Sequence, residues 1–159
     1  MDATFFLKNA VFNYRVAGVM IEDDHVLIHK QVKEKHWALP GGRVKVLEDS
    51  QTSIKREIKE ELGFDVSVDN LLWIMENFFA YNNQNYHEIG LYYRTSSAAF
   101  SFSFTKEEEF YGEEGERLIY KWTPISKIDG VNLYPEFLKE GLKEIPSTPK
   151  HLIIEDYKM

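Results

Sequence analysis

Residues 41–64 read GGRVKVLEDSQTSIKREIKEELGF, and this stretch decides how the chain organises its chemistry. From Ser50 to Leu62 the pattern is helical, because apolar residues recur every four positions at Ile54, Ile58 and Leu62. Asp49 or Ser50 is suited to cap the start, and Gly63 is suited to end the helix in a left-handed conformation. The stretch therefore predicts a loop followed by a helix over residues 50–62.

The same helix carries three glutamates, Glu57, Glu60 and Glu61, on one side. Carboxylates at these spacings repel by a few tenths of a kcal/mol per pair, and none of the three has a lysine four residues later. Such a cluster is either a solvated acidic face or a site for hard cations such as Mg²⁺ or Mn²⁺. Helix periodicity alone favours the solvated face.

The residues around the glutamates favour the cation site. Gly41 and Gly42 predict an unusual backbone conformation that approaches a metal or phosphate closely and aims a carbonyl oxygen at it. Arg56 is adjacent to Glu57 and can fix its carboxylate by a charge-assisted hydrogen bond. Glu48 is suited either to the positive end of the helix dipole or to an ion pair with Arg56.

The rest of the chain predicts one mixed α/β domain over residues 1–159. An acidic loop is expected from Glu107 to Glu116, and a short helix from Pro135 to about Ile145, because proline suits a first helical position. Apolar or alternating segments predict strands at residues 16–21, 25–31, 71–81, 86–93, 100–104 and 118–122.

The composition excludes several classes of protein. The chain has 159 residues and no cysteine, which excludes disulfide frameworks, thiolate metal sites and cysteine nucleophiles. Its net charge of -7 argues against duplex nucleic acid as a partner. There is neither a membrane-spanning apolar run nor a signal-peptide pattern, so a cytoplasmic protein with no membrane partner is expected.

The glycine–helix stretch resembles the Nudix box, the signature of the Nudix hydrolase (MutT-like) family. Every defined position matches: Gly42, Glu48, Arg56-Glu57-Ile58, Glu60-Glu61 and Gly63-Phe64. The resemblance implies a mixed β-sheet sandwiched between helices, with the box forming a loop–helix–loop. It also implies hydrolysis of a phosphoanhydride bond in a nucleoside diphosphate linked to another group, and homodimers are common in the family.

The resemblance assigns roles to the box residues. Glu57, Glu60, Glu61 and the Gly41 carbonyl would bind Mg²⁺ or Mn²⁺, and Arg56 would orient Glu57. Gly42, Glu48 and Gly63 would be structural or would support the ligands. Some relatives take the proton with a glutamate from a late loop, and three candidates occur there, among which the sequence does not choose: Glu113, Glu114 and Glu116.

Residues outside the box are expected to select the substrate. Aromatic faces suit a base, and four crowd one hairpin: Phe78, Phe79, Tyr81 and Tyr86. Because strand residues alternate, at most half are expected to line one pocket. The candidates for substrate contact are Phe79, Tyr81 and His87.

The expected substrate is a nucleoside triphosphate or a dinucleoside polyphosphate. Two alternatives stay open at this point. One is pyrophosphate removal from a 5′-triphosphorylated RNA end, against which the acidic composition argues mildly. The other is a non-catalytic, nucleotide-sensing domain, although the box carboxylates are all intact.

Overall fold

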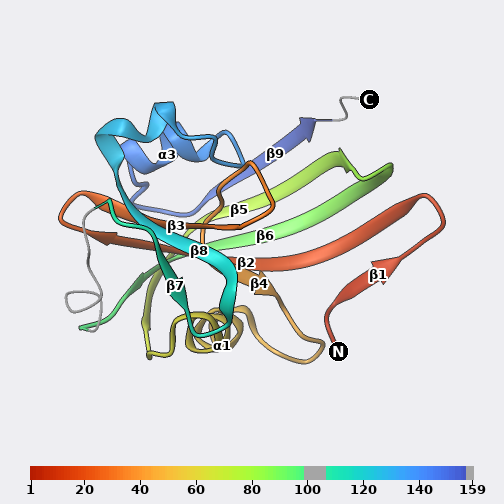
Figure 1. Ribbon diagram of the computed structural model, residues 1–159. Coiled ribbons are helices and arrows are strands. Elements are labelled where there is room, and N and C mark those ends of the chain that lie inside the picture. Colours follow the sequence, from red (N-terminus) through yellow and green to blue (C-terminus); the bar gives the residue numbers. More distant parts are fainter. Residues whose placement is uncertain (99–106, 157–159) are drawn as a thin grey trace.

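The computed structural model describes residues 1–98 and 107–156, and this part of the chain forms a nine-stranded mixed sheet with helices on both faces (Figure 1). The helices are α1 (Ser50–Leu62), the 3₁₀ helix η1 (Ile125–Gly130) and α3 (Leu138–Lys143). The strands are β1 (Thr4–Phe6), β2 (Ala10–Glu22), β3 (His25–Gln31), β4 (Gly41–Arg43), β5 (Ser67–Tyr81), β6 (Gln84–Ser96), β7 (Phe110–Gly112), β8 (Gly115–Pro124) and β9 (Lys150–Asp156).

Three long strands, β2, β6 and β5, make the centre of the sheet, whose order is β7-β8-β3-β2-β6-β5-β9. β2 and β6 run parallel, whereas β5 and β6 form an antiparallel hairpin. The other side of β2 is shared by the short strands β1 and β4. The glycine loop is therefore attached to the middle of the sheet through β4.

Two apolar clusters hold the helices against the two faces of the sheet. On one face, Ile54 and Ile58 of α1 are fully buried beside Trp122. On the other face, Leu138 and Leu142 of α3 pack in the cluster that contains Trp73. The prediction of a mixed sheet between helices is confirmed.

The helix α1 begins and ends where the sequence predicts. The Asp49 carboxylate accepts a hydrogen bond of 2.8 Å from the Thr52 backbone N–H, which settles the cap in favour of Asp49. Gly63 has a left-handed φ of 83°, and its N–H donates to the Lys59 carbonyl at 3.0 Å.

Several other predictions need correction. The residues from 107 to 116 contain β7 and the turn of a β7–β8 hairpin, because Tyr111 pairs with Ile119 across the turn. The later helix begins at Leu138, since the hydrogen bond from its N–H to the Pro135 carbonyl makes a tight turn before it. The strands β1, β4 and β9 were not predicted, and the strand expected at residues 100–104 lies outside the described residues.

None of the helices in residues 1–98 and 107–156 combines the length and the apolar character that crossing a membrane requires.

Candidate active site

A cleft of about 950 Å³ opens on the sheet where β4 meets β2. Its floor comes from β2 and β6, and one wall comes from β3 and the segment 132–136. Glu57 and Glu61 of α1 reach its edge together with Glu114 of the β7–β8 turn. The cleft therefore joins the acidic helix to the middle of the sheet.

Arg56 organises the start of the acidic helix. Its guanidinium donates two hydrogen bonds to Glu48, at 2.7 and 2.9 Å, and a third to the Arg43 carbonyl at 3.1 Å. Its Nη1 also donates to Glu57 at 3.0 Å and lies 3.3 Å from Glu60. Of the two roles left open for Glu48, the structure shows the ion pair, and these bonds lower the Glu48 pKa to about 2. Arg56 thus fixes the glycine loop and the Glu57 carboxylate with one side chain.

Gly41 and Gly42 are needed for close packing rather than for a special backbone angle, which corrects the prediction. The described glycines with positive φ are Gly63 and Gly115, so neither residue of the pair is left-handed. A Cβ on Gly41 would collide with the carbonyl of Val16, and one on Gly42 would collide with the Glu57 carboxylate. The missing side chain of Gly42 is what lets Glu57 reach the cleft from the far face of the sheet.

Glu61 is the most deeply buried of the three box glutamates, with 4% of its surface exposed, whereas the Glu60 side chain is 48% exposed. Burial, reinforced by Glu57 and Glu114, raises the Glu61 pKa to about 9. Burial also lowers the pKa of His29, whose Nδ1 lies 3.9 Å from Glu61 Oε1, to about 3. Both shifts favour the uncharged forms, so burial opposes an ion pair at this contact.

The residues at this edge fit a divalent cation, although no three acidic or histidine side chains of the described residues converge on one point. Glu61 Oε2 is buried and has no hydrogen-bond partner in the described part of the chain. A buried carboxyl with a free oxygen beside a second carboxylate gains from a positive charge, which restores its ionised form. The Glu60 side chain is 48% exposed and pairs with Arg56 at 3.3 Å, so it would have to leave Arg56 to reach such an ion.

The β7–β8 turn separates the three late-loop glutamates. Glu114 lines the cleft, and its carboxylate lies 3.5 Å from Arg117. Glu113 donates its backbone N–H to the Glu61 carbonyl at 2.7 Å, and its side chain packs over Gly63. Neither Glu113 nor Glu116 is among the described residues that line the cleft.

The aromatic candidates divide unevenly between the two faces of the hairpin. Phe79, Tyr81 and Tyr86 all line the cleft. Phe79 and Tyr86 are register partners on β5 and β6, and their rings stack with centroids 5.0 Å apart. Three of the four aromatic side chains therefore share a face, so the prediction that at most half of them line one pocket was wrong. It assumed one strand, whereas register partners on two strands point the same way.

His87 is placed on the opposite face and does not line the cleft within the described residues. Its ring stacks on Phe78 at 4.5 Å and meets the edge of Phe12 at 5.2 Å. The structure therefore brings Phe79 and Tyr81 to the site but leaves His87 in an aromatic layer behind it.

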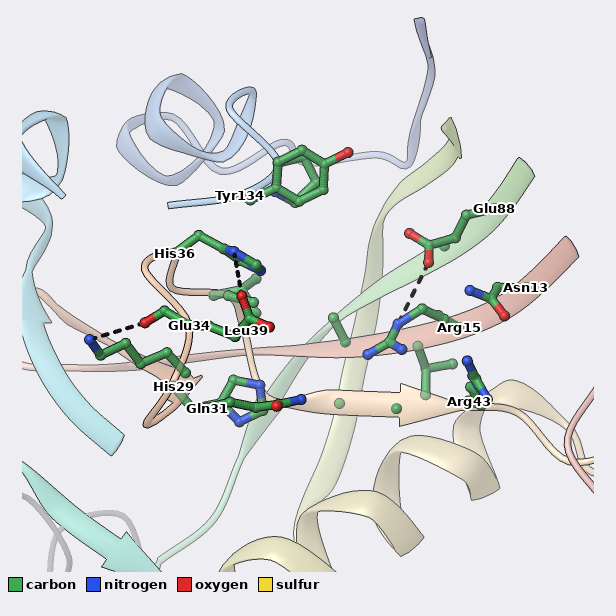
Figure 2. Close-up of a pocket in the computed structure, with 18 of the residues that line it drawn as sticks. Asn13, Arg15, His29, Gln31, Glu34, His36, Leu39, Arg43, Glu88 and Tyr134 are labelled. Atoms are coloured by element: carbon green, nitrogen blue, oxygen red, sulfur yellow. Dashed lines mark hydrogen bonds and ion pairs between the residues drawn. The ribbon is translucent and has the colours of Figure 1, made fainter. Parts of the chain in front are cut away.

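Sequence reasoning missed the polar floor of the cleft, whose side chains are Asn13 and Arg15 of β2 and Glu88 of β6. Figure 2 shows Arg15 and Glu88 facing one another, with Nε and Oε1 3.7 Å apart. Burial raises the Glu88 pKa, while Arg15 and a hydrogen bond from Asn13 oppose the shift. Alternation along β2 places Asn13 and Arg15 on one face, but only the β2–β6 register brings them to Glu88.

The comparisons with known proteins point to one family. The family model for the NUDIX domain matches residues 12–141. An 8-oxo-dGTP diphosphatase of Buchnera aphidicola is 28% identical over 149 residues, which cover 91% of this chain and 92% of that protein. A MutT-like protein of Streptomyces ambofaciens is 38% identical over 63 residues, 39% of this chain and 41% of that one.

Solved structures resemble the fold at low sequence identity. The MutT protein from Methanosarcina mazei Go1 superposes with a TM-score of 0.61 at 17% identity, over 87% of this chain and 94% of that one. A UDP-X diphosphatase gives a TM-score of 0.59 at 18% identity, over 93% of this chain and 68% of that one.

Proposed function

This chain belongs to the Nudix family and is a hydrolase of phosphoanhydride bonds, and from that premise we propose that it cleaves a nucleoside triphosphate or a dinucleoside polyphosphate with the help of Mg²⁺ or Mn²⁺. One observation carries the proposal. Glu57 and Glu61 lie at the edge of a cleft large enough for a nucleotide, and Glu61 keeps a buried oxygen without a partner in the described chain.

The residues that would hold the cation are Glu57, Glu60, Glu61 and the Gly41 carbonyl. When bound, a divalent cation neutralises the phosphate charge and lowers the pKa of a coordinated water. Oxygen donors of this kind suit Mg²⁺ or Mn²⁺.

The other residues of this edge position those ligands and move the proton. Arg56 holds Glu57 while Glu48 holds Arg56, so the carboxylate is oriented before substrate arrives. Glu114 is the late-loop carboxylate at the cleft, and we assign it as the acceptor of the proton from the attacking water. The charge of Glu114 contributes to the raised pKa of Glu61, which supports this choice over Glu113 and Glu116.

The cleft favours a small nucleotide over an RNA end. Acidic side chains outnumber arginines and lysines among its described lining residues, so it offers little attraction to a polyanionic strand. Phe79 and Tyr86 offer ring faces on which a single base can stack. An 8-oxo-dGTP diphosphatase among the relatives supports a nucleoside triphosphate as the substrate.

The test is a panel of nucleoside triphosphates, dinucleoside polyphosphates and triphosphorylated RNA assayed with Mg²⁺ or Mn²⁺. The variants Glu60→Gln and Glu61→Gln should each reduce turnover of the best substrate by about two orders of magnitude. Wild-type rates in both variants would contradict the catalytic assignment. A wild type that binds a nucleotide tightly but cleaves nothing in the panel would instead indicate a sensing domain.

A further inference from the structure

We propose that Glu88 and Asn13 are the base-reading residues of the cleft and that they select guanine over the other common bases, an inference that rests on the proposed hydrolysis of nucleotides. The geometry that points to it is a row of buried polar side chains across the centre of the sheet, next to a pair of stacked aromatic rings.

The row crosses three neighbouring strands in register. Asn13 on β2 pairs with Glu88 on β6, and Glu88 pairs with Asn77 on β5. All three are buried, with exposed fractions of 4%, 9% and 0%. Buried polar groups in the middle of a sheet cost stability unless they are hydrogen-bonded. A row of this kind is therefore expected to serve a ligand.

The row is rich in acceptors that the described chain does not satisfy. Asn13 donates to Glu88, which leaves Asn13 Oδ1 buried and unpaired within the described residues. Asn77 donates to the Tyr134 hydroxyl at 2.9 Å, and its own Oδ1 is likewise unpaired there. Asn13 and Glu88 line the cleft, whereas Asn77 supports Tyr134 at its wall. In Figure 2, Glu88 and Asn13 flank Arg15 on one side of the pocket.

The chemistry of these acceptors matches one base edge. A carboxylate accepts two parallel hydrogen bonds, and the Asn13 oxygen accepts a further one. Only guanine among the common bases presents two adjacent N–H donors, on N1 and on the 2-amino group. Adenine and cytosine place one amino donor beside a ring acceptor, which an ionised carboxylate repels. A site whose buried acceptors are left unpaired by the wrong base discriminates strongly.

The next row of the sheet supplies a surface for the ring of the base. Phe79 and Tyr86 are register partners two residues along from Asn77 and Glu88, on the same face, and their rings are tilted by only 6°. Strand residues two positions apart are about 7 Å apart, which is the scale of a base beside its hydrogen-bond partners. The polar row and the aromatic pair therefore form one pocket.

The distance between the polar row and the acidic helix suits the length of a nucleotide. Gly42, which contacts Glu57, pairs with Val16 on β2, and Glu88 lies on the strand beyond β2. Two strand spacings correspond to about 10 Å across the sheet. Glu88 pairs with Asn13, three residues along β2 from Val16, which adds about 10 Å along the strand and gives about 14 Å in all. A base at Glu88 would thus place its phosphates near the Glu57 carboxylate, with Arg15 between them.

The experiment measures binding of guanosine, inosine and adenosine 5′-monophosphates by calorimetry without added metal. Inosine monophosphate lacks the 2-amino group and so removes one donor from the guanine edge. The variants are Glu88→Gln and Asn13→Asp, and the matched control is Glu76→Gln, a part-exposed carboxylate on β5 that pairs with His151. The kcat/KM values for the corresponding triphosphates are measured with Mg²⁺ in parallel.

We expect the wild type and Glu76→Gln to bind guanosine monophosphate at least tenfold tighter than the other two. Glu88→Gln should lose at least tenfold for guanosine monophosphate, with less than a threefold change for adenosine monophosphate. Equal weakening for all three ligands, or a wild type without preference for guanosine over inosine, would overturn the inference.

The wild-type comparison needs no variant, so a Glu88→Gln protein that fails to fold still leaves a decisive result. Hydrolysis of triphosphates without guanine preference would refute the inference and leave the proposed function standing. Guanine-selective binding without hydrolysis would support the inference and refute the proposed function.

Discussion

The acidic edge of the cleft and its polar floor are built in opposite ways. At the edge, Arg56, Glu57 and Glu61 lie within one helix, and Glu48 reaches them from a few residues upstream. On the floor, Asn13 and Glu88 are distant in the sequence and meet only because β2 and β6 pair in one register. The difference teaches that the chemistry is encoded locally, whereas recognition depends on how distant strands align.

The largest effect on kcat is expected from a substitution in the turn between β7 and β8, which completes the acidic edge of the cleft. Glu114→Gln should lower kcat by about 100-fold or more, because a general base contributes that much and the amide does not accept the proton. Glu116→Gln is the control, since Glu116 is exposed and does not line the cleft in the described structure. Steady-state kinetics on both variants make the test, and equal rates for the two would remove Glu114 from the reaction.

The next prediction concerns the contact that lets the helix reach the cleft. Gly42→Ala places a methyl group against the Glu57 carboxylate and should reduce kcat/KM by roughly 10- to 100-fold, because a small displacement of a positioned group is costly. Gly130→Ala is the matched control, because no described atom lies within 4 Å of its added Cβ. If Gly42→Ala kept full activity, the close approach of Glu57 would be irrelevant to catalysis.

Mutation of the aromatic side chains that line the cleft should change KM rather than kcat. Phe79→Ala removes a stacking face and is expected to raise KM by about tenfold, since stacking of a base contributes about 1–3 kcal/mol. His87→Ala, in the aromatic layer behind the cleft, should change KM by less than about twofold while lowering the melting temperature. A larger KM effect at His87 than at Phe79 would reverse the assignment of the two faces.

The smallest effect on rate, with a clear pH signature, is expected for Glu48→Gln. The variant weakens the ion pair with Arg56 and should lose about 1 to 2 kcal/mol of stability at pH 7. Because the folded-state pKa is lowered to about 2 from the usual 4.5, this contribution is present above pH 4.5 and disappears as the pH falls towards 2. Thermal melts of both proteins should therefore converge over that range, and a constant difference would contradict the ion pair.

The sequence predicted the helix α1, its caps and its acidic face, because each of these depends on residues within a few positions of one another. It also predicted most strands of the central sheet from their apolar alternation. It did not predict β1 and β9, which are short or exposed and take their place by pairing with longer neighbours. The sequence also predicted an unusual backbone conformation at Gly42 in place of its close packing against Glu57, because a close approach between separate segments leaves no mark in the local pattern.

The candidate site shows the same division. Glu57, Glu60 and Glu61 were located from the helix and the family resemblance, whereas Arg15 and Glu88 required the strand register. For the late loop, the sequence offered three glutamates, and the direction of the β7–β8 turn brings Glu114 alone of them into the lining of the described cleft.

The acidic face of α1 is expected to bind a divalent cation, and a Mn²⁺ titration followed by electron paramagnetic resonance tests this binding most directly. We expect the wild type to bind Mn²⁺ and the double variant Glu57→Gln, Glu61→Gln to lose that binding, while Glu76→Gln titrates like the wild type. Unchanged Mn²⁺ binding in the double variant, with or without nucleotide, would contradict cation binding by the acidic face of α1.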